Sequence, residues 1–134
     1  MIKVLSIDHV VLRTTDLEAM LRFYCDVLNC PVERELKDLG LIQLRAGDAL
    51  IDIVPVDSEL GKLGGKAPSQ DGRNMDHLCL RIGQMDESQL LDYLIGHGIA
   101  VEELAERYGA QGHGRSLYIE DPERNTVELK LALE

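Results

Sequence analysis

The sequence predicts an α+β fold made of two paired βαβββ modules, whose strands form a curved, partly open, barrel-like sheet with the helices outside. Three observations predict it. The hexapeptide Asp-His-Val-Val-Leu-Arg at residues 8–13 recurs as Asp-His-Leu-Cys-Leu-Arg at 76–81. An amphipathic helical segment follows each copy, and strand-like segments follow each helix. A repeated motif within a repeated order of elements indicates internal duplication.

Length and composition fit one globular domain. The chain has 134 residues, of which 45% are hydrophobic, enough to bury a core. We therefore predict a single domain over residues 1–134. Its first module covers 1–56, a linker covers 57–75 and its second module covers 76–134.

Charge, hydropathy and cysteine number narrow the partners and the location. The formal net charge is -10 and no basic stripe is present, which argues against a nucleic-acid partner. No apolar run reaches the roughly 20 residues of a membrane span, and the N-terminus lacks a signal-peptide pattern, so we predict no membrane association and a cytoplasmic location. Cys25, Cys30 and Cys79 are an odd number in apolar surroundings and are predicted to be buried, reduced, structural thiols.

The first module begins with a predicted strand at residues 2–13, in which the period of two places His9, Val11 and Arg13 on one face. Helix-capping side chains follow at 14–16, and apolar residues then recur at helical spacing up to Leu28. The helix is expected to end at Asn29, because Pro31 prevents its continuation. Three further strands are predicted at residues 32–37, 41–46 and 49–56.

The second module repeats this order after a glycine-rich linker that is long enough to serve as a mobile segment or lid. The strand at 76–82 precedes a helix that begins at Asp86 and ends at Gly96 and Gly98. A turn is expected at 121–125. The remaining strands are predicted at residues 99–104, 116–120 and 126–133.

Four metal-competent residues occupy matched positions in the two modules. When the modules are aligned by their last strands, Asp52 matches Glu128, as His9 matches His77 in the first strands. A single histidine in a strand is more often structural, but two histidines and two carboxylates at matched positions suit a divalent transition metal. The sequence therefore predicts His9, Asp52, His77 and Glu128 as metal ligands. Glu128 or Asp52 is also the candidate catalytic acid–base group.

Further polar residues are candidates for binding a substrate. Arg13 and Arg81 each follow a candidate histidine by four residues and could bind a carboxylate or phosphate, although either could equally form a surface ion pair. Residues 105–115 contain three glycines and His113 and are predicted to form a substrate-facing loop. Ser116 and Tyr118 share one face of the next strand, which would place them beside that substrate.

The chain resembles the vicinal oxygen chelate superfamily, which includes glyoxalase I, fosfomycin-resistance transferases, extradiol dioxygenases and bleomycin-binding proteins. The resemblance is spread over nearly the whole chain. It is carried by Asp-His-Val-Val-Leu at 8–12, Arg-Phe-Tyr-Cys-Asp-Val-Leu at 22–28, His-Gly-Ile-Ala-Val-Glu at 97–102 and Tyr-Ile-Glu-Asp-Pro-Glu-Arg-Asn-Thr-Val-Glu at 118–128.

The resemblance implies paired βαβββ modules around a divalent metal ion such as Ni, Zn, Co, Mn or Fe. An acid in each module is most similar to glyoxalase I, which implies a lactoylglutathione lyase-like enzyme that stabilises an enediolate, with glutathione as a co-substrate. Arg13 stands where glyoxalase I has an arginine that holds a glutathione carboxylate. Two positions depart from that pattern, because Asp52 replaces a glutamate and Val56 replaces a glutathione-contacting asparagine.

Two alternatives remain open at this point. His9, His77 and Glu128 without Asp52 resemble the two-His-one-carboxylate set of Fe(II) extradiol dioxygenases, and Tyr118 matches a tyrosine of that family. A non-catalytic protein that binds a drug or metabolite is the second alternative. All three hypotheses share a small-molecule ligand, and the family implies a homodimer.

Overall fold

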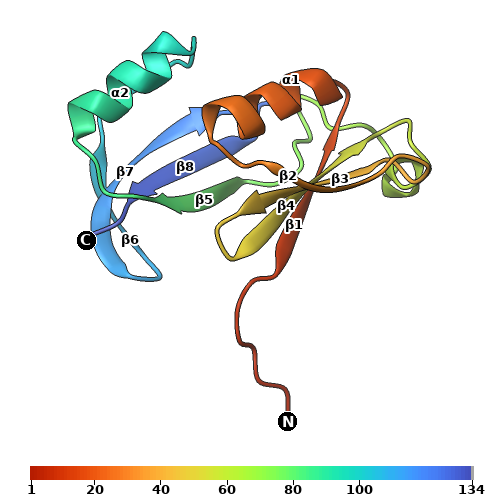
Figure 1. Cartoon of the computed structure of the whole chain (residues 1–134), viewed down its shortest axis with the longest axis horizontal. Helices are drawn as coiled ribbons and strands as arrows, with labels where there is room; N and C mark the ends of the chain where they lie inside the picture. The colour runs from red at the N-terminus through yellow and green to blue at the C-terminus, as the bar shows by residue number, and fades with distance from the viewer. Residues whose placement is uncertain (134) are drawn as a thin grey trace. The chain divides into compact units, whose positions relative to one another are not determined.

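The computed structural model describes residues 1–133, and the chain divides into two compact units, the first covering Met1–Asn74 and the second beginning at Met75. Unit 1 contains β1 (His9–Thr14), α1 (Leu17–Leu21), the π-helical η1 (Arg22–Val27), β2 (Val32–Leu36), β3 (Leu41–Ala46), β4 (Ala49–Pro55) and the short 3-10 helix η2 (Gly61–Gly64). Unit 2 contains β5 (His77–Ile82), α2 (Glu87–Gly96), β6 (Ala105–Gly109), β7 (Gly112–Glu120) and β8 (Thr126–Leu131). Figure 1 labels these elements. The α+β class and the repeated βαβββ order are confirmed.

Each unit builds one four-stranded mixed sheet with the same strand arrangement. The orders are β1-β4-β3-β2 and β5-β8-β7-β6. The first strand of each unit runs parallel to the last, and the other neighbours are antiparallel. The histidine-bearing strand therefore lies directly beside the acid-bearing strand in both units.

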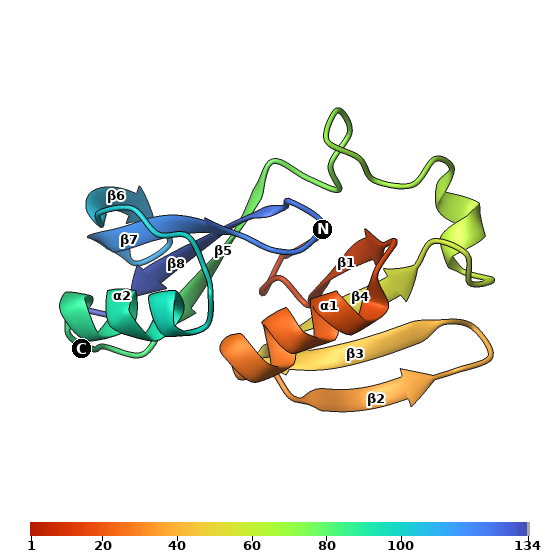
Figure 2. The same ribbon diagram turned by 90° about the horizontal axis from the view of Figure 1, so that it is seen from above.

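Alternation along β1 determines which side chains enter the core of unit 1. Leu12 and Thr14 are buried, whereas His9 and Val11 on the other face are exposed, as the period of two predicts. Helix α1 packs on β4, as Figure 2 shows. The apolar stripe of this helical segment buries Met20 and Tyr24, so these side chains and Leu12 form the hydrophobic core under the helix.

Capping residues define the helix ends much as the sequence predicts. Asp16 accepts a hydrogen bond from the backbone N–H of Ala19 at 3.1 Å, and Asn29 adopts a left-handed φ of 57°. Helix α2 begins at Asp86, whose carboxylate accepts from the N–H of Ser88. At its other end the left-handed Gly98 reverses the chain. Helix termini were therefore readable from short polar residues and glycine.

Three expectations about the strands and thiols are wrong. Residues 1–7 are outside any strand, and β1 begins only at His9. The strand expected at 99–104 is absent, because residue 99 is still hydrogen-bonded back to the end of α2. Of the three thiols predicted to be buried, only Cys30 is. Cys25 is half-buried, and Cys79 is exposed because it shares the outward face of β5 with His77 and Arg81.

The segment predicted as a substrate-facing loop at 105–115 is instead a β-hairpin. Strands β6 and β7 pair up to Gly109 and Gly112, so the connection has only two residues. Gly112 has a φ of 91°, which glycine adopts without steric cost. The glycines that suggested a flexible loop therefore include the residues that close a tight turn.

The predicted turn at 121–125 is confirmed and fixes the entry into β8. Buried Asp121 accepts hydrogen bonds from the N–H groups of Glu123 and Asn125, both at 2.9 Å. Arg124 takes a left-handed φ of 65° in the same turn. This internal bonding sets the register of the strand that carries Glu128. Among residues 1–133, no helix has the length and apolar character needed to cross a membrane.

Candidate functional site

The strand register gives the two candidate acids equivalent positions. In each unit, the residue two places after the candidate histidine pairs with the acid of the last strand. Asp52 on β4 thus corresponds to Glu128 on β8, and His9 corresponds to His77. Both acids are buried, with Asp52 3% exposed and Glu128 6% exposed, while both histidines are exposed. Each unit therefore offers one accessible imidazole and one buried carboxylate on the same sheet face.

In unit 1, both members of the pair are held by neighbouring side chains. The Nδ1 atom of His9 lies 2.6 Å from Oδ1 of Asp8. The hydrogen bond with Asp8 raises the pKa of His9, and the charge of Asp52 raises it further. Gln43, directly opposite on β3, donates from Nε2 to both carboxylate oxygens of Asp52 at 3.3 Å.

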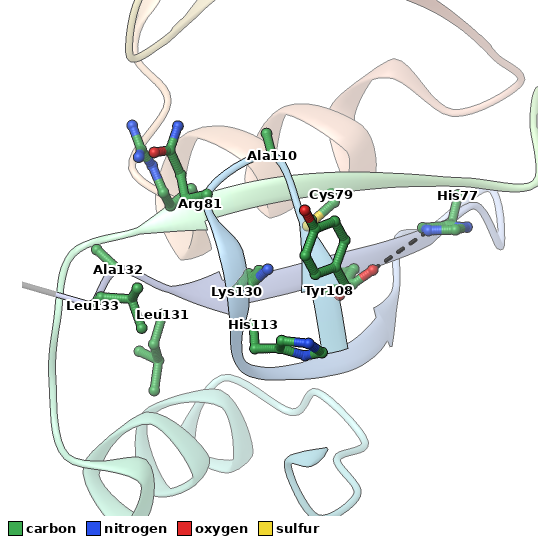
Figure 3. A pocket seen from close by; sticks show the side chains of 13 residues that line it. His77, Cys79, Arg81, Tyr108, Ala110, His113, Lys130, Leu131, Ala132 and Leu133 are labelled. Atoms are coloured by element: carbon green, nitrogen blue, oxygen red, sulfur yellow. Dashed lines mark ion pairs between the residues drawn. The ribbon is translucent and has the colours of Figure 1, made fainter. Parts of the chain in front are cut away.

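In unit 2, the histidine and the acid are themselves in contact. The Nε2 atom of His77 lies 3.4 Å from Oε1 of Glu128, the pair marked by the dashed line in Figure 3. The Nδ1 atom of His77 lies 2.7 Å from Asp76, which repeats the Asp–His contact of unit 1. The ring of Tyr118 meets the imidazole edge-on, with 5.6 Å between centroids. The imidazole is thus held from two sides while Nε2 faces the carboxylate.

A chain of hydrogen bonds fixes the carboxylate of Glu128. The hydroxyl of fully buried Ser116 donates to Oε2 of Glu128 at 2.7 Å. Arg107 in turn donates to the Ser116 hydroxyl at 3.1 Å and to its carbonyl at 2.6 Å. The guanidinium also stacks over Tyr118, 4.3 Å from the ring centroid. Ser116 therefore contacts Glu128, a candidate metal ligand, directly. This contact favours a role in positioning Glu128 over the predicted contact of Ser116 with substrate.

The donor atoms in each unit suit a transition metal in chemical type. Imidazole nitrogen and carboxylate oxygen both bind divalent metals, and an aspartate on Nδ1 leaves Nε2 as the ligand atom. Within the part of the chain that the structure describes, neither unit brings together three His, Cys, Asp or Glu side chains that could hold a metal. The residues present thus fit a metal in chemical type, with two candidate ligands contributed by each unit.

A cavity of about 590 Å³ opens beside the pair in unit 2. Strands β5 and β8 and the β6–β7 hairpin form its walls, and Glu128 is one of the lining residues. The predicted substrate-binding residues Arg81 and His113 line it. Lys130, which the sequence analysis did not single out, projects into it, as Figure 3 shows. Tyr118 lies on a second cavity of about 480 Å³ in the same unit.

The cysteine in this cavity is not a poised nucleophile. Cys79 lines the wall between His77 and Arg81 on β5. Desolvation raises the pKa of its thiol, and the neighbouring Glu128 carboxylate raises it further. A raised pKa favours the neutral thiol, whereas nucleophilic attack requires the thiolate.

Comparison with known proteins identifies the family. Residues 6–129 match the model of the Glyoxalase/Bleomycin resistance protein/Dioxygenase superfamily. The chain belongs to this superfamily. The match covers most of the chain, so the resemblance predicted from the sequence is confirmed.

Solved structures share the superfamily fold over nearly the full chain. An integron cassette protein from V. cholerae is 26% identical, covers 98% of each chain and has a TM-score of 0.79. A virulence protein from Salmonella typhimurium is 24% identical, covers 98% of this chain and 100% of its own, and has a TM-score of 0.80. A lactoylglutathione lyase from Agrobacterium tumefaciens is 21% identical, with coverages of 95% and 93% and a TM-score of 0.67. At these identities the last two establish the fold alone.

In this superfamily member, Arg13 is engaged by the segment that follows β4. Its guanidinium donates to the carbonyls of Gly61 at 3.2 Å and Gly65 at 3.1 Å, and also to that of Lys66. Its backbone exchanges two hydrogen bonds with the side chain of Asn74. Arg13 thus holds the predicted linker by hydrogen bonds. Contact of Arg13 with a substrate carboxylate stays a prediction.

Sequence reasoning missed several residues that surround the site, and three of them carried a readable signal. Asp8 and Asp76 stand in the repeated hexapeptide beside each histidine, so the repeat itself marked them. Lys130 follows Glu128 by two residues and therefore shares its strand face. Gln43 and Arg107 act across strands, and only the hairpin registers reveal their partners.

Proposed function

We propose that this chain is a divalent-metal-dependent enzyme of the glyoxalase I type that acts on a small molecule with vicinal oxygens. One observation carries the proposal. Each unit presents an exposed histidine and a buried carboxylate at equivalent register positions, and each histidine is braced on Nδ1 by the preceding aspartate. A duplicated pair of this kind is expected where two half-sets of ligands serve one ion.

The residues divide into ligands and positioning groups. His9, Asp52, His77 and Glu128 would hold the ion, and Asp8 and Asp76 would orient the imidazoles. When bound, the metal supplies Lewis-acid stabilisation of negative charge on two neighbouring substrate oxygens. Its identity among Ni, Zn, Co, Mn and Fe, and the use of glutathione, are open to the assays below.

Glu128 is the residue best supported for moving a proton. A catalytic base must lie within hydrogen-bond reach of the substrate atom it deprotonates. Glu128 lines the cavity, and Oε2 is held by Ser116 while Oε1 faces His77. Oε2 of Glu128 is thus fixed by a hydrogen bond, and Oε1 lies on the side of the His77 imidazole. Asp52, which is shorter and held by Gln43, is the second candidate for this role.

Metal content and turnover test the proposal together. Protein purified without added metal is expected to contain a divalent ion, which His77→Ala should lose and the exposed-site control Lys37→Met should retain. The metal content of Asp52→Ala tests in the same way whether this shorter acid is a ligand. The metal-loaded protein should convert the hemithioacetal of methylglyoxal and glutathione. If Ni, Zn, Co and Mn forms all leave that compound unchanged, the glyoxalase activity is rejected.

A second candidate is an Fe(II) dioxygenase that opens a catechol-like ring. The packing of Tyr118 against His77, 5.6 Å between ring centroids, favours it, because this tyrosine matches one found in the dioxygenases of the family. Oxygen uptake with catechols under Fe(II), without hemithioacetal conversion, would support this reading. A protein with ligand binding but no metal would instead be a non-catalytic drug- or metabolite-binding member. For each of these functions we retain the cytoplasm as the predicted location.

A further inference from the structure

Lys130 is a buried lysine in the wall of the cavity. The residue is only 8% exposed. Its Nζ atom donates one hydrogen bond, to the carbonyl of Gly112 at 2.6 Å. No ion pair involves Lys130 among residues 1–133. An ammonium group has three donors, and burying one without an anion is unfavourable.

The β6–β7 hairpin is shaped around this lysine. A Cβ atom added at Gly109 would lie 2.8 Å from Nζ of Lys130, and one at Gly114 would lie 2.9 Å from its Cε. Gly112 supplies the carbonyl acceptor. The three glycines therefore accommodate the Lys130 side chain. Gly109 and Gly114 leave space for it, and Gly112 accepts its hydrogen bond.

Arg81 adds a second positive charge on the same wall of the cavity. The register of β5 and β8 pairs Arg81 directly with Lys130, and both line the cavity of about 590 Å³. In Figure 3, Lys130 projects into the cavity between Arg81 and Tyr108. The Arg81 side chain is exposed, and no hydrogen bond or ion pair of its guanidinium occurs within the described residues. Two basic side chains that line one cavity can attract an anion, and the planar fork of arginine matches a carboxylate.

We propose that this cavity binds the carboxylate of a small organic anion between Lys130 and Arg81. Glu128 lies two residues before Lys130 on the same face of β8, so their Cα atoms are roughly 7 Å apart along the strand. A ligand anchored at Lys130 would thus extend its other polar groups toward His77 and Glu128. If the proposed function holds, its substrate is a carbonyl or hydroxy-carbonyl compound that also carries a carboxylate.

Titration of the metal-free, 15N-labelled protein with 4-oxopentanoate tests the anion site separately from the metal. Saturable shifts of amides around the cavity are expected, and Lys130→Met and Arg81→Gln should each weaken binding at least about tenfold, or ~1.4 kcal/mol. The exposed controls Lys37→Met and Arg34→Gln should leave affinity unchanged. The neutral 4-oxopentanamide should bind at least about tenfold more weakly, on the same scale. Unchanged affinity in both cavity variants, or equal binding of the amide, overturns the proposal.

Inorganic phosphate distinguishes the class of anion. Stronger binding of phosphate than of 4-oxopentanoate would reject a carboxylate site. Thermal unfolding provides a further readout, because a lysine kept for binding costs stability. Lys130→Met is therefore expected to keep or raise the Tm while it weakens binding. A lower Tm with unchanged affinity would show that Lys130 is structural and would overturn the proposal.

The outcomes separate this inference from the proposed function. If the protein binds no metal and converts no hemithioacetal but still binds 4-oxopentanoate through Lys130, the anion site stands and the glyoxalase proposal fails. If metal-dependent turnover is found but no carboxylate binds, the anion site fails and the enzyme proposal stands. Metal content of Lys130→Met is expected to equal that of the wild type, since Lys130 is not a ligand.

Discussion

Single residues explain why the repeated hexapeptide contains an aspartate as well as a histidine. Asp8 and Asp76 each contact Nδ1 of the histidine that follows, at 2.6 and 2.7 Å. This contact fixes the ring nitrogen that remains for a ligand or proton. The motif is therefore a histidine together with the group that orients it, repeated in both units.

Candidate site residues were predictable where a one-dimensional pattern encodes them. Alternation placed His9 and His77 on exposed strand faces, and the internal repeat matched Asp52 with Glu128. The hydrogen bonds from Arg107 to Ser116 and from Ser116 to Glu128 were not predictable. They join neighbouring strands across two hairpins, and a register shifted by one residue would place each side chain on the opposite face.

Ser116→Ala tests whether this serine positions the carboxylate of Glu128. The variant removes a 2.7 Å hydrogen bond to a buried oxygen, so unfolding free energy should fall by about 1–3 kcal/mol. Metal affinity should fall by about 10–100-fold, as for other groups that orient ligands. Urea unfolding and metal titration measure the two effects.

Ser116→Thr retains the hydroxyl and should restore most of the metal affinity, while Ser69→Ala on the exposed linker should change neither quantity. A purely structural serine would lower stability in Ser116→Ala and leave metal affinity at the wild-type value. That pattern would contradict the positioning role.

At the scale of elements, the sequence predicted helices and most strands but misread the β6–β7 hairpin. Helix ends were readable because Asp16, Asn29 and Asp86 act locally as caps. The prediction of a loop at 105–115 failed because glycine has several structural uses. Gly112 closes a tight turn, whereas Gly114 leaves room for the lysine of a neighbouring strand. Only the three-dimensional packing separates these uses from flexibility.

Gly114→Ala tests the shaping of this hairpin around Lys130. The added methyl would lie 2.9 Å from Cε of Lys130, so the flexible lysine is expected to shift rather than the backbone. We expect a severalfold weaker binding of 4-oxopentanoate with little change in Tm, measured by NMR titration and thermal unfolding. Gly83→Ala is the matched control, because a Cβ at Gly83 meets open space. Equal ligand affinity in Gly114→Ala and wild type would show that the ammonium does not depend on this glycine.

At the scale of the whole molecule, internal duplication accounts for both the fold and the proposed metal site. Two βαβββ units have the same strand order and the same position for a His–acid pair. Side chains around the two acids differ, because Gln43 faces Asp52 where Tyr118 faces Glu128. The two units thus have the candidate ligands in common, while the side chains around them differ.

The same scale carries the prediction of a homodimer. Strand β1 is an edge strand of its sheet, and the segment before it, residues 1–7, exposes Met1, Ile2, Val4, Leu5 and Ile7. Exposed apolar side chains next to an open sheet edge favour pairing with another chain. Light scattering should therefore give about twice the 14.9 kDa mass of one chain.

Deletion of residues 1–7 should shift the protein toward monomer, because it removes these side chains and leaves β1 and the core of unit 1 intact. A matched variant with Ile2, Val4, Leu5 and Ile7 changed to serine should weaken the dimer similarly if apolar burial drives association. A wild-type mass of one chain at every concentration tested would refute the dimer.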